Sequence, residues 1–339
     1  MDASELECAS FAGALWLAIS RITSFRLTNR KYRYSFTSPG AAAALGSQLV
    51  KLSCIQNLDL SDIRLYSEGV RLLGPHLAQL TSLQQLDLGS NFISVSGIKA
   101  LGPHLSLLMS LRQLSLTQNS IGPDGAQVLG PHLAHLKHLQ KLYLRCTGID
   151  ADGVASLGPH LAQLTSIQEV DLSFNQIGNS GIKLLGPHLA QLTSMQELGL
   201  SNNRIGDVGI RSLGPHLAHL TYIKQLDLRC NEIGEDGAES LGPHLAHLTS
   251  IQLLDLGYNR MSDEGIKSLG PHLAHLRAIQ LLDLSYNRFR GLGIWSLGPH
   301  LAGLRSMQQL LLRGNAMSAD GVAMLKLCLD HLPSLEFDI

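Results

Sequence analysis

Histidine is the residue type whose number and spacing in this 339-residue sequence could support chemistry. Nine histidines recur within one pentapeptide, Leu-Gly-Pro-His-Leu, and four of them precede a second histidine by three residues. Two imidazoles at that spacing on a helix could bind a metal ion. No carboxylate or thiolate at short spacing completes a tetrahedral set, and a residue copied in every repeat serves the repeat. We therefore expect structural histidines, with no metal and no cofactor. The nine are His76, His104, His132, His160, His188, His216, His244, His272 and His300, and the four partners are His135, His219, His247 and His275.

Other catalytic arrangements are missing from the sequence. No nucleophile and base, phosphate-binding glycine loop or carboxylate pair stands at a motif spacing. The glycines recur at turn positions, and a turn is sufficient reason for them. The sequence therefore predicts a protein that is not an enzyme.

The pentapeptide itself defines the organisation of the chain. Each copy begins 28 residues after the previous one, without insertion or deletion. A fixed period of this length is typical of stacked repeats, in which each unit buries its apolar side against its neighbours. The copies begin at Leu73, Leu101, Leu129, Leu157, Leu185, Leu213, Leu241, Leu269 and Leu297.

One repeat predicts a helix, a short strand and two turns. Residues 97–124 show apolar residues first at helical spacing and then in alternation, as a strand requires. An asparagine, an isoleucine and a glycine-rich turn follow. The helical stripe is Ile98, Leu101, Leu105 and Leu108, the strand contains Leu111, Leu114 and Leu116, and the turn follows Asn119 and Ile121.

Two repeated polar or restricted positions carry further expectations. The repeated asparagine can satisfy backbone groups where the chain leaves each strand, so stacked copies should form a ladder. It stands at Asn91, Asn119, Asn175, Asn203, Asn231, Asn259, Asn287 and Asn315, and Ile63 and Thr147 replace it, which predicts weaker turns there. The proline of the pentapeptide, Pro103 in the type repeat, cannot donate to a helix. We expect each helix to kink or restart at this proline.

The pattern Leu-x-x-Leu-x-Leu-x-x-Asn-x-Ile-Gly resembles the leucine-rich repeat, from about Pro39 to the C-terminus. Its period and internal helix resemble the ribonuclease-inhibitor-like class. The resemblance implies an α/β fold, a right-handed solenoid or horseshoe with parallel strands on the concave face and helices on the convex face. We expect a degenerate N-terminal capping repeat over 1–40, ten repeats over 41–324 and a C-terminal cap over 325–339. The basic aromatic stretch 30–34 is interpreted as part of the first cap, with a docking strip as the alternative.

Composition limits the partners. The formal net charge of −1 argues against nucleic acid. Five sparse cysteines favour free thiols in a reducing compartment, and we expect the cytoplasm. No apolar run is long enough to cross a membrane. Acidic residues precede the apolar stretch 11–19, against a secretory signal. A bacterial effector delivered without a cleaved signal is an alternative.

Variable positions on the strands predict where a partner binds. The residue between the last two leucines of each strand should face the concave side. Six of the ten such residues are aspartate: Asp59, Asp87, Asp171, Asp227, Asp255 and Asp283. Arg145, Arg229 and Arg313 stand two residues after three members of this column, Tyr143, Asp227 and Leu311. The column indicates either a solvated face with Asp–Arg pairs or a polar recognition surface.

Two neighbouring repeats break the polar pattern. Leu253 and Leu281 replace polar residues, and Tyr258 and Tyr286 should stack one strand apart, flanked by arginines and extended by Leu311. Tyrosine and arginine around an apolar centre are typical of binding hot spots. The alternative is that two repeats were duplicated together and kept their copies. The predicted partner-binding residues are Leu253, Asp255, Tyr258, Arg260, Leu281, Asp283, Tyr286, Arg288, Leu311 and Arg313.

A second unusual residue, Trp295, should lie on the outer helix face, where it either packs sideways on a neighbouring helix or marks a convex contact. Taken together, the sequence predicts a non-catalytic scaffold or adaptor that binds a protein on its concave face. The resemblance offers three alternatives: an enzyme inhibitor, a GTPase-activating protein, and a sensor or effector in innate immunity or host interaction. A structural array without a ligand is another. The sequence predicts no oligomeric state.

Overall fold

A computed structural model describes residues 23–27, 39–52, 54–332 and 335–338. The chain divides into unit 1, residues 1–167, and unit 2, residues 168–339. Within the described residues, twelve short strands alternate with eleven helices, one strand and one helix to each repeat. The predicted α/β repeat fold is therefore confirmed.

Unit 1 contains the first five strands and five helices. Its strands are β1 (Ser24–Arg26), β2 (Asn57–Asp59), β3 (Gln85–Asp87), β4 (Gln113–Ser115) and β5 (Lys141–Tyr143). Its helices are α2 (Pro39–Leu49), α3 (Tyr66–Leu77), α4 (Val95–Leu105), α5 (Gly122–Leu133) and α6 (Ala151–Leu161).

Unit 2 contains the remaining seven strands and six helices. Its strands are β6 (Glu169–Asp171), β7 (Glu197–Gly199), β8 (Gln225–Asp227), β9 (Leu253–Asp255), β10 (Leu281–Asp283), β11 (Gln309–Leu311) and β12 (Glu336–Asp338). Its helices are α7 (Gly178–Leu189), α8 (Asp207–Leu217), α9 (Glu235–Leu245), α10 (Asp263–Leu273), α11 (Gly291–Leu301) and α12 (Ala319–Leu329).

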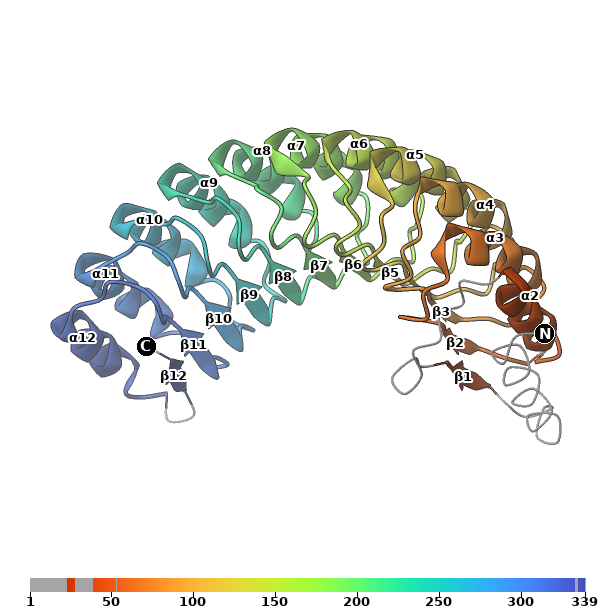
Figure 1. Ribbon diagram of the computed structural model, residues 1–339. Helices are drawn as coiled ribbons and strands as arrows, with labels where there is room; N and C mark the ends of the chain where they lie inside the picture. The colour runs from red at the N-terminus through yellow and green to blue at the C-terminus, as the bar shows by residue number, and fades with distance from the viewer. Residues whose placement is uncertain (1–22, 28–38, 53, 333–334, 339) are drawn as a thin grey trace. The chain divides into compact units, whose positions relative to one another are not determined.

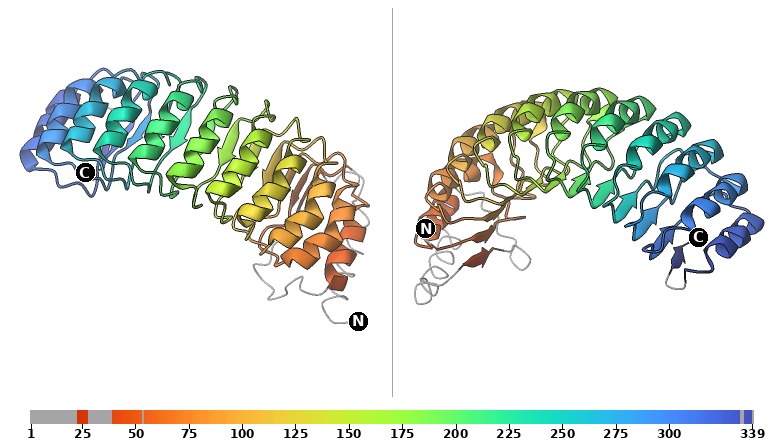
Figure 2. Two further views of the ribbon diagram at one scale, coloured as in Figure 1. Left: turned by 90° about the horizontal axis from the view of Figure 1, so that it is seen from above. Right: turned by 180° about the vertical axis from the view of Figure 1, so that it is seen from behind.

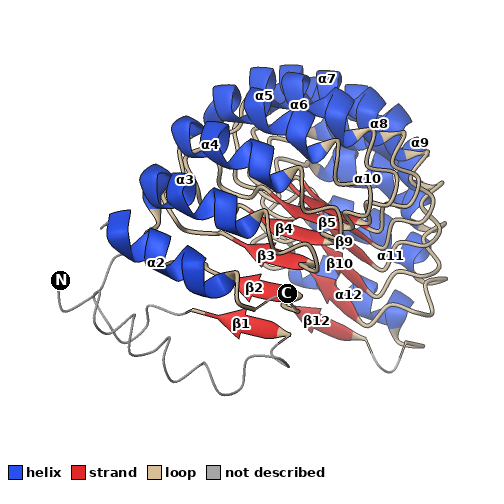
Figure 3. Ribbon diagram, turned by 90° about the vertical axis from the view of Figure 1, so that its right-hand side faces the viewer, coloured by secondary structure: helices blue, strands red, loops and turns tan. Residues whose placement is uncertain are grey.

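In each unit, taken by itself, the strands form one layer and the helices another (Figure 1). Neighbouring strands pair in parallel with equivalent residues opposite each other, as in Leu86 with Leu114 and Leu254 with Leu282. Consecutive helices lie side by side along the other layer of each unit (Figure 2). The view of α2–α4 beside β2–β4 shows the two layers of unit 1 most directly (Figure 3). This register aligns the equivalent residues of successive repeats in columns that run across each unit.

The core lies between the two layers and consists of the repeated leucines and isoleucines. Leu101, Leu114 and Leu116 of the type repeat are completely buried, as their equivalents in unit 2 are. Burying one such side chain contributes about 1.5–3 kcal/mol. At one core position, Phe289 replaces the Met261 and Ile233 of the two preceding repeats. The side chain of Phe289 is also completely buried.

The asparagine ladder is confirmed. Asn231 donates from Nδ2 to the carbonyl oxygens of Leu200 and Leu228, and its Oδ1 accepts the N–H groups of Asn203 and Ile205. One side chain thus satisfies backbone groups of its own repeat and of the preceding repeat. In the repeat with Thr147, the threonine hydroxyl donates to Leu144 O at 2.7 Å. This bond replaces part of the asparagine's role.

The Gly-Pro-His segment has a packing role. A β-carbon on Gly74 would stand 2.6 Å from Cδ2 of His104 in the next helix, and one on Gly186 would stand 2.6 Å from Cδ2 of His216. Each glycine therefore makes room for the imidazole of the following repeat. Of the two expectations for the proline, a restart of the helix is wrong, because Pro103 lies inside α4, which ends at Leu105. A kink at this proline stays a prediction. The proline lies in the last turn, so its missing N–H affects little helix.

Several helices of unit 2 are capped by the repeat before them. Asn179 Oδ1 accepts the N–H groups of Gly206 and Gly209, and Asp207 Oδ1 accepts the N–H of Gly234. Asp263 does the same for Arg290 and Gly293. An oxygen acceptor at a helix N-terminus contributes about 0.5–2 kcal/mol. The sequence pattern of a single repeat does not predict this capping, because the cap and its helix are 27–30 residues apart.

The two ends of the array are described only in part. β1 pairs with β2, and β12 pairs with β11. Most of the predicted N-terminal cap, including the basic aromatic stretch 30–34, lies outside the described residues. No helix among the described residues is long and apolar enough to cross a membrane.

Candidate functional site

The ten predicted partner-binding residues all lie in unit 2, on or just after strands β9, β10 and β11. Leu253 and Leu281 are half-buried at paired positions of neighbouring strands, and Leu281 in turn pairs with Gln309. Asp283 pairs with Leu311, which is also half-buried. We call the exposed side of these strands, with the turns that follow them, the strand face. The register of the strands brings the predicted residues of β9, β10 and β11 to this face.

The tyrosines stack as predicted. The ring centroids of Tyr258 and Tyr286 are 4.1 Å apart, with an angle of 20° between the ring planes. Arg229 covers Tyr258, with Cζ 4.5 Å from the ring centroid. The ring of Tyr286 lies over Gly314, where a β-carbon would stand 2.5 Å from Cδ1 of the tyrosine. We call Arg229, Tyr258, Tyr286 and Gly314 the tyrosine stack.

The arginine that covers Tyr258 is Arg229 and not Arg260 or Arg288, the two arginines that the sequence predicts beside the tyrosines. Arg260 Nη1 instead lies 3.0 Å from Glu232 Oε2, so this guanidinium is already in an ion pair. Arg229 was noted in the sequence only as a neighbour of the aspartate column. The sequence could have indicated Arg229, because it lies one repeat before Tyr258 in the column next to that of the tyrosines.

The backbone at both tyrosines is left-handed. Their φ angles are 53° and 52°. The equivalent residue of the other repeats adopts the same conformation, at Asp62, Ser90, Gln118, Cys146, Phe174, Asn202, Cys230 and Gly314. Glycine, asparagine and aspartate tolerate this region, whereas a bulky side chain there costs about 1 kcal/mol or more. The turn imposes this conformation in every repeat. The backbone preference of tyrosine therefore does not explain why two successive repeats have tyrosine at this position.

Aspartates form a continuous row beside the tyrosine stack. Asp227, Asp255 and Asp283 face one another in register on β8, β9 and β10, and we call them the aspartate row. Oδ1 of each accepts the backbone N–H two residues later, at 2.8–2.9 Å. Each carboxylate thereby caps the end of its own strand. This bond gives the aspartates a structural role that their position in the sequence did not predict.

The row is electrostatically crowded. Burial raises the pKa of Asp255 to about 7, with a further contribution from the carboxylates of Asp283 and Asp227. The Gly257 N–H and the charge of Arg229 act in the opposite direction. Burial likewise raises the pKa of Asp227. Asp255 is therefore only partly ionised at neutral pH, chiefly because its carboxyl group is buried.

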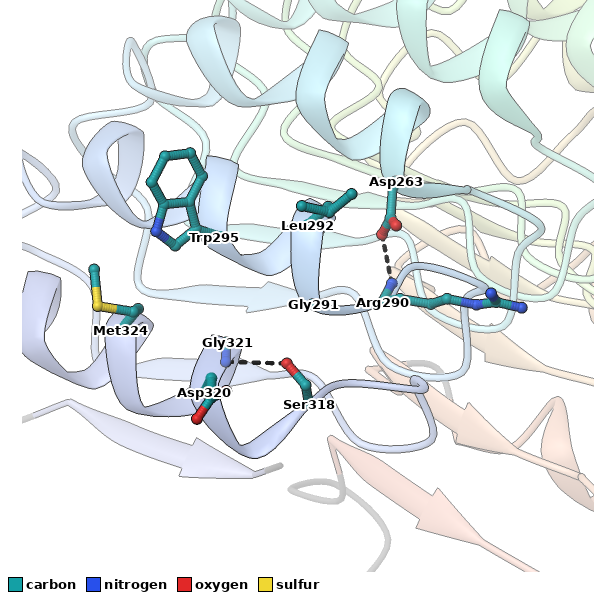
Figure 4. A pocket seen from close by; sticks show the side chains of 9 residues that line it. All are labelled: Asp263, Arg290, Gly291, Leu292, Trp295, Ser318, Asp320, Gly321 and Met324. Atoms are coloured by element: carbon teal, nitrogen blue, oxygen red, sulfur yellow. Dashed lines mark hydrogen bonds between the residues drawn. The ribbon is translucent and has the colours of Figure 1, made fainter.

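The exposed tryptophan lies on the helix layer. The side chain of Trp295 is 59% exposed and lines a groove of about 720 Å³ together with Leu292 and Met324 (Figure 4). Thus it contributes to a surface between α11 and α12. The polar rim includes Asp263, whose carboxylate is already bonded to the Arg290 N–H. This groove is the second candidate contact surface.

The described residues hold no group of three or more side chains that could bind a metal ion. The repeated histidines lie in the helix layer, against the glycines of preceding helices. Burial lowers the pKa of His132, His216, His244 and His272, and the following histidine adds to the effect. These four histidines therefore favour the neutral form in the fold.

Comparisons with known proteins agree with this architecture. A family model described as Leucine Rich repeat matches residues 79–102, 108–130, 135–158, 163–186, 191–214, 219–242 and 247–270. Together with the strand and helix order, these matches show that the chain is a leucine-rich-repeat protein. No curated protein sequence matches it.

Two solved structures show the same fold. A TDR receptor is 19% identical with a TM-score of 0.60, and the match covers 97% of this chain and 48% of the receptor chain. An internalin, InlF, from Listeria monocytogenes is 20% identical with a TM-score of 0.55, covering 99% of this chain and 94% of the internalin. This chain thus spans about half the length of the receptor. At these identities the likeness concerns the fold alone.

Proposed function

We propose that this protein is a non-catalytic interaction scaffold that binds a protein partner through the strand face of unit 2. The observation that carries the proposal is the tyrosine stack. Two large amphipathic side chains, each 39% exposed, are held rigid by stacking in a backbone conformation that tyrosine disfavours. Tyrosine and arginine side chains around apolar residues compose the hot spots of many interfaces, and Leu253 and Leu281 lie half-buried on the same strand face.

The same proposal includes a class and a compartment. A 28-residue period with one helix in each repeat supports the ribonuclease-inhibitor-like class of leucine-rich repeats. Cys146, Cys230 and Cys328 carry free thiols, which supports a reducing compartment such as the cytoplasm.

An enzyme inhibitor is the second candidate. The aspartate row favours it, because three carboxylates in register offer a complementary surface to a basic enzyme. In this alternative the bound partner loses activity, whereas a scaffold leaves the partner's activity unchanged. An activity assay of the captured partner separates the two.

The test is capture of a partner from extract of the protein's own cell, followed by measurement of its affinity. The double variant Tyr258→Ala/Tyr286→Ala should bind the captured partner with a loss of more than about 1 kcal/mol. Its free energy of unfolding should change much less, because both rings lie on the surface and alanine keeps the same left-handed backbone.

Unit 1 provides the matched control. Tyr66 and Phe92 also stack on the surface, with centroids 5.2 Å apart, but they lie outside the proposed site. The variant Tyr66→Ala/Phe92→Ala should keep the partner. Equal losses of binding in both double variants, or losses that follow stability in each, would contradict the proposal.

A further inference from the structure

The aspartate row has unused acceptor atoms next to the tyrosine stack. Oδ1 of Asp255 is fixed by the Gly257 N–H, and Oδ1 of Asp283 by the Ser285 N–H. Within the described part of the chain, the second oxygen of each of these two carboxylates has no hydrogen-bond or ion-pair partner. Because the first bond orients the carboxylate, the second oxygen is already in position to accept.

The column two residues after the aspartates has glycine at position 257, where the repeat before it has Arg229. This column reads Arg229, Gly257, Ser285 and Arg313 across four repeats. A β-carbon on Gly257 would stand 3.1 Å from Oδ1 of Asp255 and 3.2 Å from Oδ1 of Asp283, so both carboxylates border this position directly. We call Asp255, Gly257, Tyr258, Asp283 and Tyr286 the Gly257 cluster.

Arg229 links the carboxylate of Asp255 to the ring of Tyr258, because it acts on both. Its guanidinium lies over the Tyr258 ring and its charge also acts on Asp255. Arg229 stands one repeat earlier, so it serves only one end of the row. Asp283, at the other end, is followed two residues later by a serine, which has no charge.

Unit 1 shows what the second oxygen of such an aspartate binds. Asp59 occupies the same column, and its Oδ1 accepts the Ser61 N–H at 3.0 Å. Its Oδ2 lies 2.6 Å from Nε of Arg26. A guanidinium therefore fits the free oxygen of an aspartate in this column without disturbing the bond that caps the strand.

We propose that the Gly257 cluster binds the guanidinium of an arginine in a basic segment of the protein partner, with Asp255 and Asp283 accepting its N–H groups beside the two tyrosines. The inference rests on the proposed function, since it names the chemistry that the strand face recognises. Arginine fits better than lysine because its planar guanidinium can bridge two carboxylates and lie flat against aromatic side chains.

Binding of this kind is linked to protons. The charged groups acting on Asp255 are Asp227 and Arg229 from the preceding repeat and Asp283 from the following repeat. A guanidinium binds the ionised carboxylate, and with a pKa of about 7 the ionised fraction of Asp255 falls roughly tenfold from pH 8 to pH 6. The affinity for an arginine-containing segment should fall by about the same factor.

The experiment selects binders from a displayed library of random dodecapeptides on the full-length protein at pH 8. The parent is compared with Asp255→Asn/Asp283→Asn, in which an amide oxygen can still accept the Gly257 and Ser285 N–H groups. The matched control is Asp59→Asn/Asp87→Asn, which changes the same column in unit 1. Tyr258→Ala/Tyr286→Ala tests the proposed function in the same selection.

We expect peptides rich in arginine that bind the Asp255→Asn/Asp283→Asn variant at least tenfold more weakly and the control variant within twofold. Replacing their arginine by citrulline should cause the same loss. Peptides that need the tyrosines but contain no arginine, or contain only lysine, overturn the arginine assignment and leave the proposed function standing. If no peptide distinguishes the parent from the tyrosine variant, both proposals fail.

Discussion

The strand faces of the two units are built on the same repeat but carry different side chains. In unit 1 the aspartate column reads Asp59, Asp87, Ser115 and Tyr143, and an arginine pairs with the first aspartate. In unit 2 three successive aspartates lie beside stacked tyrosines, with Arg229 serving one end. The backbone frame is the same in both units, so the difference lies only in the variable columns. A repeat of this kind separates the residues that hold the fold from those that can recognise a partner.

The largest expected effect tests whether the frame is shared. Asn119 in unit 1 and Asn231 in unit 2 make equivalent bonds: each donates to carbonyls of two repeats and accepts two N–H groups. Replacing either by leucine leaves several buried backbone groups unsatisfied, at about 1–3 kcal/mol each. Both variants should lower the free energy of unfolding by about 4 kcal/mol, measured by denaturant titration.

A threonine at either position should restore part of that loss, since Thr147 already bonds Leu144 O in this way. A loss confined to one unit would mean that the two frames are not equivalent, and the comparison would have to be abandoned.

A smaller effect concerns the helix layer. Alanine at Gly74 or at Gly186 would place a β-carbon 2.6 Å from the imidazole of the next helix, His104 or His216. Each substitution should cost about 1–3 kcal/mol, because the ring must move out of its packed position. Thermal unfolding of the two variants, one in each unit, measures it.

Gly303→Ala is the control, because nothing lies within 4 Å of the added carbon. Removing the imidazole in the double variant Gly186→Ala/His216→Ala should recover most of the loss caused by the alanine. If Gly303→Ala is as costly as the others, the contact with histidine is not the reason for the glycine.

The smallest expected effect is a difference in how stability depends on pH between the aspartates of unit 1 and those of unit 2. The pKa of Asp255 is raised from 3.8 to about 7, so between these values the folded protein keeps a proton that the unfolded chain has released. The contribution of Asp255 to the free energy of unfolding therefore falls as pH rises from about 4 to about 7. Asparagine does not titrate, so Asp255→Asn should be more stable than the parent at pH 8, by about 1–2 kcal/mol.

In unit 1 the same substitution should have the opposite sign. Asp59 is paired with Arg26, and losing an exposed pair costs up to about 1 kcal/mol. Chemical unfolding of both variants at pH 5 and pH 8 measures the contrast. A parent that is as stable as Asp255→Asn at pH 8 would show that the aspartate row is not electrostatically crowded.

The sequence by itself determined the frame of this protein. The 28-residue period predicted the order of strand and helix, the leucine core and the asparagine ladder, because each depends on residues that recur at fixed spacing. It also placed Tyr258 and Tyr286 side by side, since parallel strands in register bring equivalent residues together. These features follow from periodicity alone.

Only the tertiary structure decided which side chains meet across repeats outside their own column. It placed the guanidinium of Arg229 over the ring of Tyr258 in the next repeat. Contacts between helix caps, glycines and imidazoles of consecutive repeats were also decided there, as was the backbone bond of each aspartate. Such contacts depend on distances between neighbouring columns and on side-chain direction, which the period does not specify. The repeat fixes where each residue stands, and packing fixes which neighbour it touches.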